Sequence, residues 1–160
     1  AHTPAMECNP PVDSATPAST NGLSPRWNQV LAHRPEADGS RREAAERFIA
    51  AGISPEQVWA ALVDGGDALY AAASNGPNWT EPFGGPVAVA LLAAEVSALA
   101  AHLSARAAGV RARAVEELLD EYSAIAVAGQ LGVSRQKVYE LGRGSDSRPP
   151  AIAQVPWRSS

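Results

Sequence analysis

The sequence predicts an all-α protein, and three observations support that prediction. Hydrophobic residues make up 46% of the 160 positions, and many of them are alanine, the strongest helix former. Aromatic residues make up only 6%. Apolar residues recur at helical spacings of three and four, and no segment alternates apolar and polar residues as a half-buried strand would. A chain of this length suits one compact domain or two very small ones.

The first segment, residues 1–24, is rich in proline, serine and threonine. It holds too little apolar surface to offset the entropy lost on ordering, so we expect a disordered leader. Cys8 is the single cysteine of the chain, which argues against a disulfide framework and a thiolate metal site. The leader lacks a secretion signal pattern, and no apolar run of about eighteen residues is free of charge. We therefore expect a cytoplasmic protein with no membrane span.

A helical pair is predicted next. Ser40 and Glu43 form a predicted capping box for a helix over residues 41–51, which Gly52 ends. The segment 54–57, with a serine, a proline and a glutamine, starts a second helix in the same way. We expect the pair to bury Ala45, Phe48, Ile49, Val58, Trp59, Leu62 and Val63.

A long helical tract begins at Pro86 and runs toward Tyr122, after a glycine- and proline-rich linker over residues 76–85. Its apolar residues alternate steps of three and four, which is the spacing of a coiled-coil seam. The seam residues are Val89, Leu92, Val96, Leu99 and Leu103. Two interpretations are open: the seam pairs with a second copy, or it packs under the amino-terminal helices. Gly109 either breaks the tract or lies within one helix of about 55 Å.

Residues 123–143 have the pattern of two short helices joined by a tight turn. Ala128 is small where the two helices would touch, and Gly132 stands where the chain reverses. Ser123 and Ser134 stand where each helix would start, where a hydroxyl accepts a bond from an unpaired backbone N–H. The predicted inner side carries Ile125, Val127, Leu131, Val133, Val138 and Leu141. A preceding helix is expected to pack on it through Val115, Leu118, Leu119 and Tyr122.

This segment resembles the helix-turn-helix of bacterial DNA-binding regulators. The positions that match are Ala128, Gly132, Val133, Ser134 and Val138. The resemblance covers residues 123–143 and identifies no particular family. It implies that the second helix, Arg135–Leu141, lies in the major groove of double-stranded DNA. The candidate DNA-contacting residues are Ser134, Arg135, Gln136, Lys137, Tyr139, Glu140 and Arg143.

The chemistry of these side chains suits DNA. Arginine and lysine donate to guanine O6 and N7, and glutamine pairs both ways with adenine. Ser134 and Arg143 are suited to hold phosphates. The simpler interpretation is a solvated polar face in a small helical domain. A generic pair of amphipathic helices, however, does not need alanine and glycine at these two positions.

The amino-terminal pair echoes this motif. Gly52-Ile53-Ser54 matches Gly132-Val133-Ser134 at a distance of eighty residues. Two features argue against a second DNA-reading helix: Phe48 stands where Ala128 would let the helices approach, and Pro55-Glu56-Gln57 replaces the basic segment 135–137. The pair is therefore either a degenerate second helix-turn-helix, suited to bind protein, or an ordinary helical hairpin.

Charge and chemistry limit the function classes. The net charge of −4 argues against a protein that coats nucleic acid indiscriminately, whereas the carboxyl end is locally basic. The tail, residues 144–160, is predicted to be flexible. His2, His33 and His102 are scattered, and no phosphate-binding loop or metal-ligand spacing occurs. We expect neither an enzyme nor a cofactor or metal.

The sequence thus favours a sequence-specific transcriptional regulator, homodimeric and nucleoid-associated, because a single motif reads few bases and gains from two half-sites. Two alternatives stay open: a protein-interaction module whose motif is structural, and a DNA-architectural protein of plasmid or phage maintenance. The predicted divisions are residues 1–24 (leader), 25–75 (amino-terminal helical region), 76–85 (linker), 86–109 (long helix, candidate dimerisation), 110–143 (helix-turn-helix domain) and 144–160 (tail).

Overall fold

The computed structural model describes residues 22–35 and 38–143, and every regular element in these ranges is a helix. The predicted all-α class is confirmed. In chain order the elements are α1 (Pro25–Val30), α2 (Ser40–Ala50), α3 (Pro55–Val63), α4 (Asp67–Ala72), the 3-10 helix η1 (Glu81–Phe83), α5 (Pro86–Glu121), α6 (Ala124–Leu131) and α7 (Arg135–Gly142). The predicted leader, up to residue 21, and the predicted tail lie outside the described residues.

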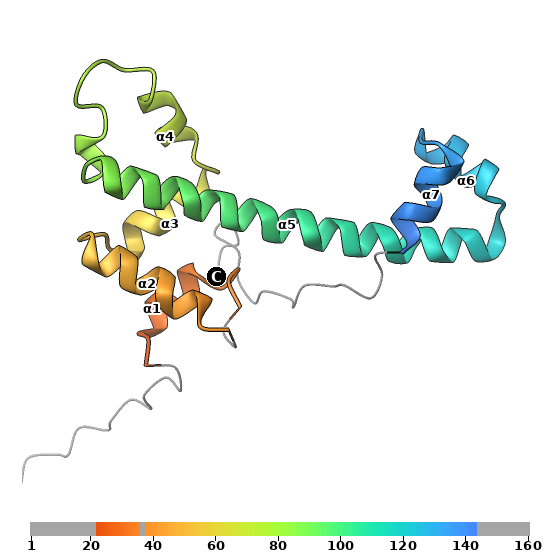
Figure 1. Cartoon of the computed structure of the whole chain (residues 1–160), viewed down its shortest axis with the longest axis horizontal. Helices are drawn as coiled ribbons and strands as arrows, with labels where there is room; N and C mark the ends of the chain where they lie inside the picture. Colours follow the sequence, from red (N-terminus) through yellow and green to blue (C-terminus); the bar gives the residue numbers. More distant parts are fainter. Residues whose placement is uncertain (1–21, 36–37, 144–160) are drawn as a thin grey trace, which may run out of the picture.

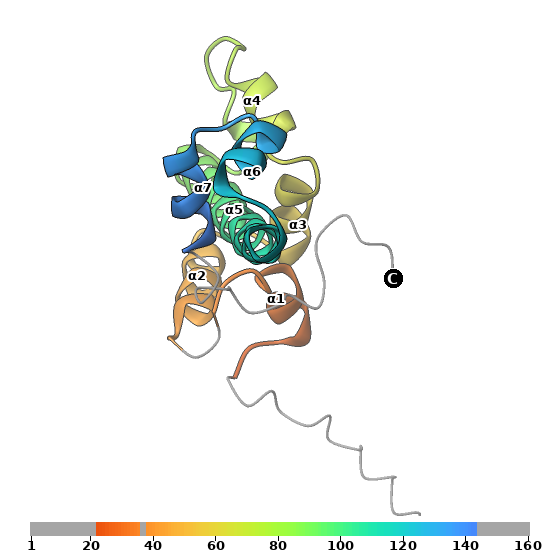
Figure 2. The same ribbon diagram turned by 90° about the vertical axis from the view of Figure 1, so that its right-hand side faces the viewer.

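The helix α5 is the long helix that joins the amino-terminal helices to α6 and α7. It runs without interruption for 36 residues, or about 54 Å at 1.5 Å per residue. Gly109 lies inside it, so the predicted boundary between residues 109 and 110 falls within one helix. Figure 1 shows α1 to α4 gathered along its amino-terminal half and α6 and α7 at its carboxyl end. Viewed along α5, α1 and α2 lie beneath it and α3 lies beside it (Figure 2).

The larger of two hydrophobic cores lies between α5 and the amino-terminal helices. Trp27 of α1 stacks on Phe48 of α2, with ring centroids 5.9 Å apart. Leu92 and Leu99, at the centre of the predicted seam, are buried in this core, and the other three seam residues pack against it. The chain's own helices therefore cover the seam. Of the two interpretations, packing under the amino-terminal helices describes the structure, and the seam is not an exposed dimerisation surface.

A buried ionic cluster also joins α5 to this core. The carboxylate of Glu95 is only 2% exposed, and the Arg34 guanidinium donates to both of its oxygens, at 2.8 and 2.9 Å. The Nε2 atom of His33 lies 2.5 Å from Oε1 of Glu95. Burial alone raises the pKa of Glu95, but the hydrogen bonds from His33 and Arg34 outweigh it and leave the pKa below its ordinary value. This cluster lets a carboxylate stay charged inside the core.

Several predictions for the amino-terminal half are wrong. The N-cap of α2 is Gly39 in a left-handed conformation, and Ser40 is the first helical residue, so no capping box forms there. Ile49 and Trp59 are 57% and 38% exposed. In helices of only two to three turns, apolar residues fall on more than one side. Their spacing alone therefore does not show which side is buried. The capping box between Ser54 and Gln57 does form.

The predicted linker over residues 76–85 belongs to the amino-terminal body. It contains η1, and its Phe83 packs against the larger core. The predicted helical pair did not include α1, although Ser24 and Pro25 are the same kind of helix start as Ser54 and Pro55. This helix begins at Pro25 after the N-cap Ser24 and contributes Trp27 and Val30 to that core.

By length and composition alone, α5 is apolar enough to cross a membrane, and the core helix of a soluble protein meets the same criteria. In this structure the side of α5 that carries Leu92 and Glu95 is covered by the amino-terminal helices.

Candidate nucleic-acid interface

The helices α6 and α7 and their turn, residues 123–143, form what we call the carboxyl-terminal unit. Ser123 caps α6, because its Oγ accepts the Ala126 N–H at 3.2 Å. Gly132 ends α6 with a φ of 67°, a left-handed conformation that glycine adopts without strain. The N–H of Val133 then donates to the Ala128 carbonyl at 3.1 Å. Next, Ser134 caps α7 by accepting the Lys137 N–H at 3.1 Å.

A second, smaller core holds this unit on the end of α5. Its buried members are Val115, Val127, Ala128 and Val138, with Leu118, Leu119, Val133 and Leu141 packed around them. Gly142 lies close to α5, since a Cβ at that position would sit 3.6 Å from Cγ1 of Val115. Three helices thus pack around this core, and the carboxyl end of α5 is the first of them.

Three apolar residues expected on the inner side are not buried there. Ile125 is 69% exposed, Leu131 is 41% exposed, and Tyr122 is half exposed. Ile125 precedes the buried Val127 by two residues, which puts it about 200° around the helix and hence on the opposite side. Leu131 is the last residue of α6, where the chain turns away at Gly132. The unit therefore carries exposed apolar surface as well as its polar side.

All seven predicted DNA-contacting residues are exposed, while Val138 between them is fully buried. At 100° per residue, Gln136, Glu140 and Arg143 point most directly away from Val138, and Lys137 and Tyr139 flank them. Ser134 and Arg135 lie at the amino end of α7. The structure thus brings the candidates onto the outer side and the amino end of one short helix.

Positive charge in the carboxyl-terminal unit is concentrated on α7. Arg135 and Lys137 lie in its first turn and Arg143 at its end, whereas α6 carries no charged residue. Lys137 and Glu140 form an ion pair at 3.6 Å between half-exposed side chains, which is worth little in water. The adjoining end of α5 is acidic, and Arg113 there pairs with two of its glutamates at 3.3 and 3.5 Å. Within the described residues of the carboxyl-terminal unit, an approaching phosphate therefore meets basic side chains on α7 and none on α6.

The helices α2 and α3 and their turn, residues 40–63, form the amino-terminal unit, and its turn has the same geometry. Gly52 has a φ of 73°, and the Ile53 N–H donates to the Phe48 carbonyl at 2.9 Å. Ser54 accepts the Gln57 N–H at 3.2 Å, and Val58 is fully buried like Val138. The echo seen in the sequence thus extends to the backbone and its hydrogen bonds.

The first turn of α3 differs in charge from the first turn of α7. Glu56 stands where α7 has Gln136, and it forms an ion pair with Arg26 at 3.1 Å. Its own backbone N–H, and then Arg26, lower the pKa of Glu56 through hydrogen bonds, so the side chain is negative at neutral pH. An anionic first turn repels phosphate, as the sequence indicated.

The histidines and acids of the described residues form no metal-ligand grouping. No group of three or more histidine, cysteine, aspartate or glutamate side chains in that part of the chain could hold a metal ion. His102 is half-buried, and its Nε2 has no hydrogen-bond partner in the described structure. Burial, with smaller contributions from Arg106 and His33, lowers the pKa of His102. His2 lies outside the described residues.

Comparison with known proteins identifies no relative: no protein-family model, no curated protein and no solved structure matches this chain significantly. Any statement about function therefore rests on the residues and on their geometry.

Proposed function

We propose that this protein is a sequence-specific DNA-binding transcriptional regulator that inserts α7 into the major groove. The observation that supports this most directly is the exposure of every candidate residue on α7, while Val138 is buried against α5 and α6. A helix that is anchored on one side and polar on the other can enter a groove without losing its own core contacts.

Each candidate has a proposed role. Arg135 and Lys137 donate to guanine edges, and Gln136 pairs with adenine, because these residues occupy the first turn, which enters the groove most deeply. Ser134 and Arg143 hold phosphates at the two ends of the helix. Tyr139 and Glu140 complete the outer side. Glu140 favours sites where a cytosine amino group is within reach, since a carboxylate accepts from cytosine N4.

We further propose that the regulator binds as a homodimer. An α7 of eight residues contacts few base pairs, and a second copy doubles the number of positions read. Because the seam of α5 is covered, the second copy would contact the exposed apolar side chains Val110, Tyr122 and Ile125 instead. A cytoplasmic, nucleoid-associated location follows from this proposal.

Enrichment of bound duplexes from a random pool tests the proposal. A regulator selects a short motif, and a homodimer selects it as an inverted repeat with half-sites about one helical turn apart. A pool that stays random after repeated rounds at low salt contradicts the proposal. In a salt titration on the selected duplex, we expect binding to weaken as the salt concentration rises, while the preference over a scrambled duplex persists.

A second candidate function is a protein-interaction module. It is supported by the absence of charge on α6 and by the 69% exposure of Ile125 on the same helix. Such a module retains no duplex in the same titration, even at low salt. A DNA-architectural protein would retain duplexes without selecting a motif, so the two experiments together separate all three functions.

A further inference from the structure

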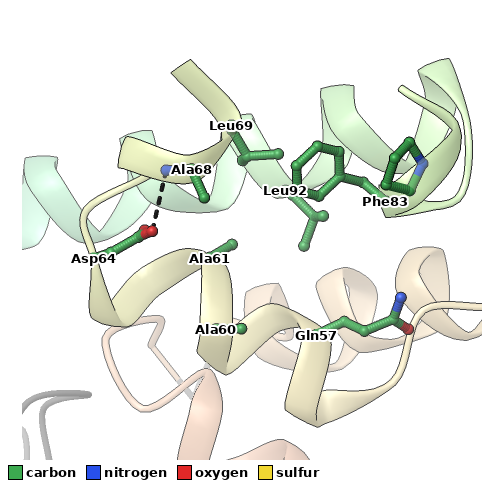
Figure 3. Close-up of a pocket in the computed structure, with 9 residues that line it drawn as sticks. Gln57, Ala60, Ala61, Asp64, Ala68, Leu69, Phe83 and Leu92 are labelled. Carbon is green, nitrogen blue, oxygen red and sulfur yellow. Dashed lines mark hydrogen bonds between the residues drawn. The ribbon is translucent and has the colours of Figure 1, made fainter. Parts of the chain in front are cut away.

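A cavity of about 150 Å³ opens between α3, the α4 and η1 segments and the amino end of α5. Figure 3 shows Leu69, Phe83 and Leu92 gathered on one side of it, with Ala60 and Ala61 of α3 on the other. Gln57 and Asp64 lie at opposite ends of the α3 side. The walls are therefore mostly apolar, with polar groups only at the two ends.

This cavity occupies the side of α3 that corresponds to the outer side of α7. With the offset of eighty residues between the two units, Gln57 corresponds to Lys137 and Ala60 to Glu140. In α7 those positions face open solvent, whereas in α3 both are also exposed but line the cavity that α4 and η1 border. The amino-terminal unit thus keeps the turn of the motif, but α4 and η1 border the side of its second helix that would face a groove.

The polar groups at the ends of the cavity have fixed positions. The Asp64 carboxylate accepts the Gly66 N–H at 2.9 Å through Oδ1 and the Ala68 N–H at 3.1 Å through Oδ2. A carboxylate has about four lone-pair sites, so acceptor capacity is left for a ligand. At the other end, the Gln57 side chain uses its Oε1 to accept the Ser54 N–H at 2.8 Å, an interaction that does not use its NH₂ group.

The size of the cavity limits the ligand. A cavity of about 150 Å³ is large enough for a benzene-sized molecule, whereas sites for larger organic ligands usually exceed about 300 Å³. The carboxylate of Asp64 attracts a hydrogen-bond donor or a cation and repels an anion.

We propose that this cavity binds a small single-ring aromatic alcohol or amine, with the ring between Ala60, Leu69 and Phe83 and the donor directed to Asp64. The proposal does not depend on DNA binding by α7, because all the groups that it uses lie on α3, α4, η1 and the amino end of α5.

Titration of the full chain with phenol and benzylamine, followed by NMR, tests the proposal, and benzoate serves as the anionic comparison. We expect saturable binding of phenol and benzylamine and none of benzoate. The variant Ala60→Leu extends this wall into the cavity and should weaken phenol binding at least about tenfold, because its side chain takes up the volume of the ligand. The matched control is Ala100→Leu, the same change at an exposed position of α5 outside the cavity.

Circular dichroism and urea unfolding establish that each variant is folded, and Ala60→Met serves if Ala60→Leu is not. Three results would overturn the proposal: no saturable binding of phenol or benzylamine to the parent chain, parental phenol affinity in a folded Ala60 variant, or benzoate binding as tight as that of benzylamine. Duplex binding is measured on the same samples without ligand. A failure of the proposed DNA binding can therefore be distinguished from a failure of the proposed aromatic site.

Discussion

The amino-terminal and carboxyl-terminal units have almost the same turn, yet their second helices have different surroundings. In both units a left-handed glycine is followed by an apolar residue whose N–H bonds back to the first helix, then by a capping serine and a buried valine. The outer side of α7 is open and partly basic, whereas the corresponding side of α3 borders a cavity shared with α4 and η1 and begins with an acid. The turn thus fixes how two helices meet, and the elements packed around them decide what the second helix can contact.

The two units also differ in what anchors them to α5. The larger, amino-terminal core contains the buried Glu95 cluster, whereas the small core of the carboxyl-terminal unit consists of apolar side chains alone. A buried ion pair contributes little net free energy when intact, but its disruption leaves an uncompensated charge in the core.

The largest effect is expected from Glu95→Ala. The substitution leaves Arg34 and His33 without their buried partner, and we expect the free energy of unfolding of the amino-terminal core to fall by about 3–5 kcal/mol. Hydrogen exchange of α1 to α3 and urea unfolding measure this loss. The control Glu117→Ala removes an exposed pair with Arg113 and should change stability by less than about 1 kcal/mol. Equal losses in the two variants would contradict a structural role for the cluster.

The same cluster predicts a pH dependence. The pKa of Glu95 is lower in the folded chain than its ordinary value, so the unfolded chain binds more protons as the pH falls. The stabilisation is fully present above the unfolded pKa of about 4.3 and is lost as the pH falls through the folded pKa. The stability difference between the parent chain and Glu95→Ala should therefore narrow below about pH 4. A difference that is constant from neutral to acidic pH would refute this account.

A smaller effect is expected from Arg135→Ala, which tests the proposed role of α7. Loss of a side chain that reads a guanine should remove about 1–3 kcal/mol of discrimination at one base position, measured by competition between duplexes that differ only there. The counterpart change in the amino-terminal unit, Glu56→Ala, should leave duplex binding unchanged. If the selected motif is the same for the parent chain and Arg135→Ala, Arg135 does not read a base.

The smallest effect is expected from replacing the turn glycines by alanine, which compares the two turns directly. Gly52 and Gly132 both have left-handed φ values, 73° and 67°, and a Cβ at either position would meet nothing within 4 Å. Alanine at either position should therefore cost about 1–2 kcal/mol of stability from backbone strain alone. The matched control, Gly129→Ala, lies inside α6 with equal space and should stabilise by about 0.5–1 kcal/mol. A marked difference between the two turn variants would show that the turns are not equivalent.

Much of the fold could be predicted from the sequence because its signals are local. The turn glycines, the caps at Ser54, Ser123 and Ser134, and the helical spacing each depend on residues within one or two turns. Which surface covers a helix depends on distant residues. For that reason the seam around Leu92 and Leu99 could be recognised, whereas the partner that covers it could not be chosen.

The sites show the same division. The exposure of the candidates on α7 followed from their periodicity relative to Val138, and their contact with DNA stays a prediction. The Glu95 cluster was missed because His33 and Arg34 lie some sixty residues away, although a single acid within an apolar tract was a usable signal. The cavity beside α3 was missed because its lining comes from four separate elements.

The unbroken length of α5 has a mechanical consequence. Successive residues of an α-helix are rotated by about 100° about its axis. Each residue inserted between Leu103 and Val115 would therefore move the carboxyl-terminal unit about 1.5 Å along α5 and rotate it by about 100° about the helix axis. Seven inserted residues would return the carboxyl-terminal unit to within about 20° of its original orientation about the α5 axis, about 10 Å further along that axis. The number of residues in that stretch thus sets the direction in which α7 faces relative to the amino-terminal body.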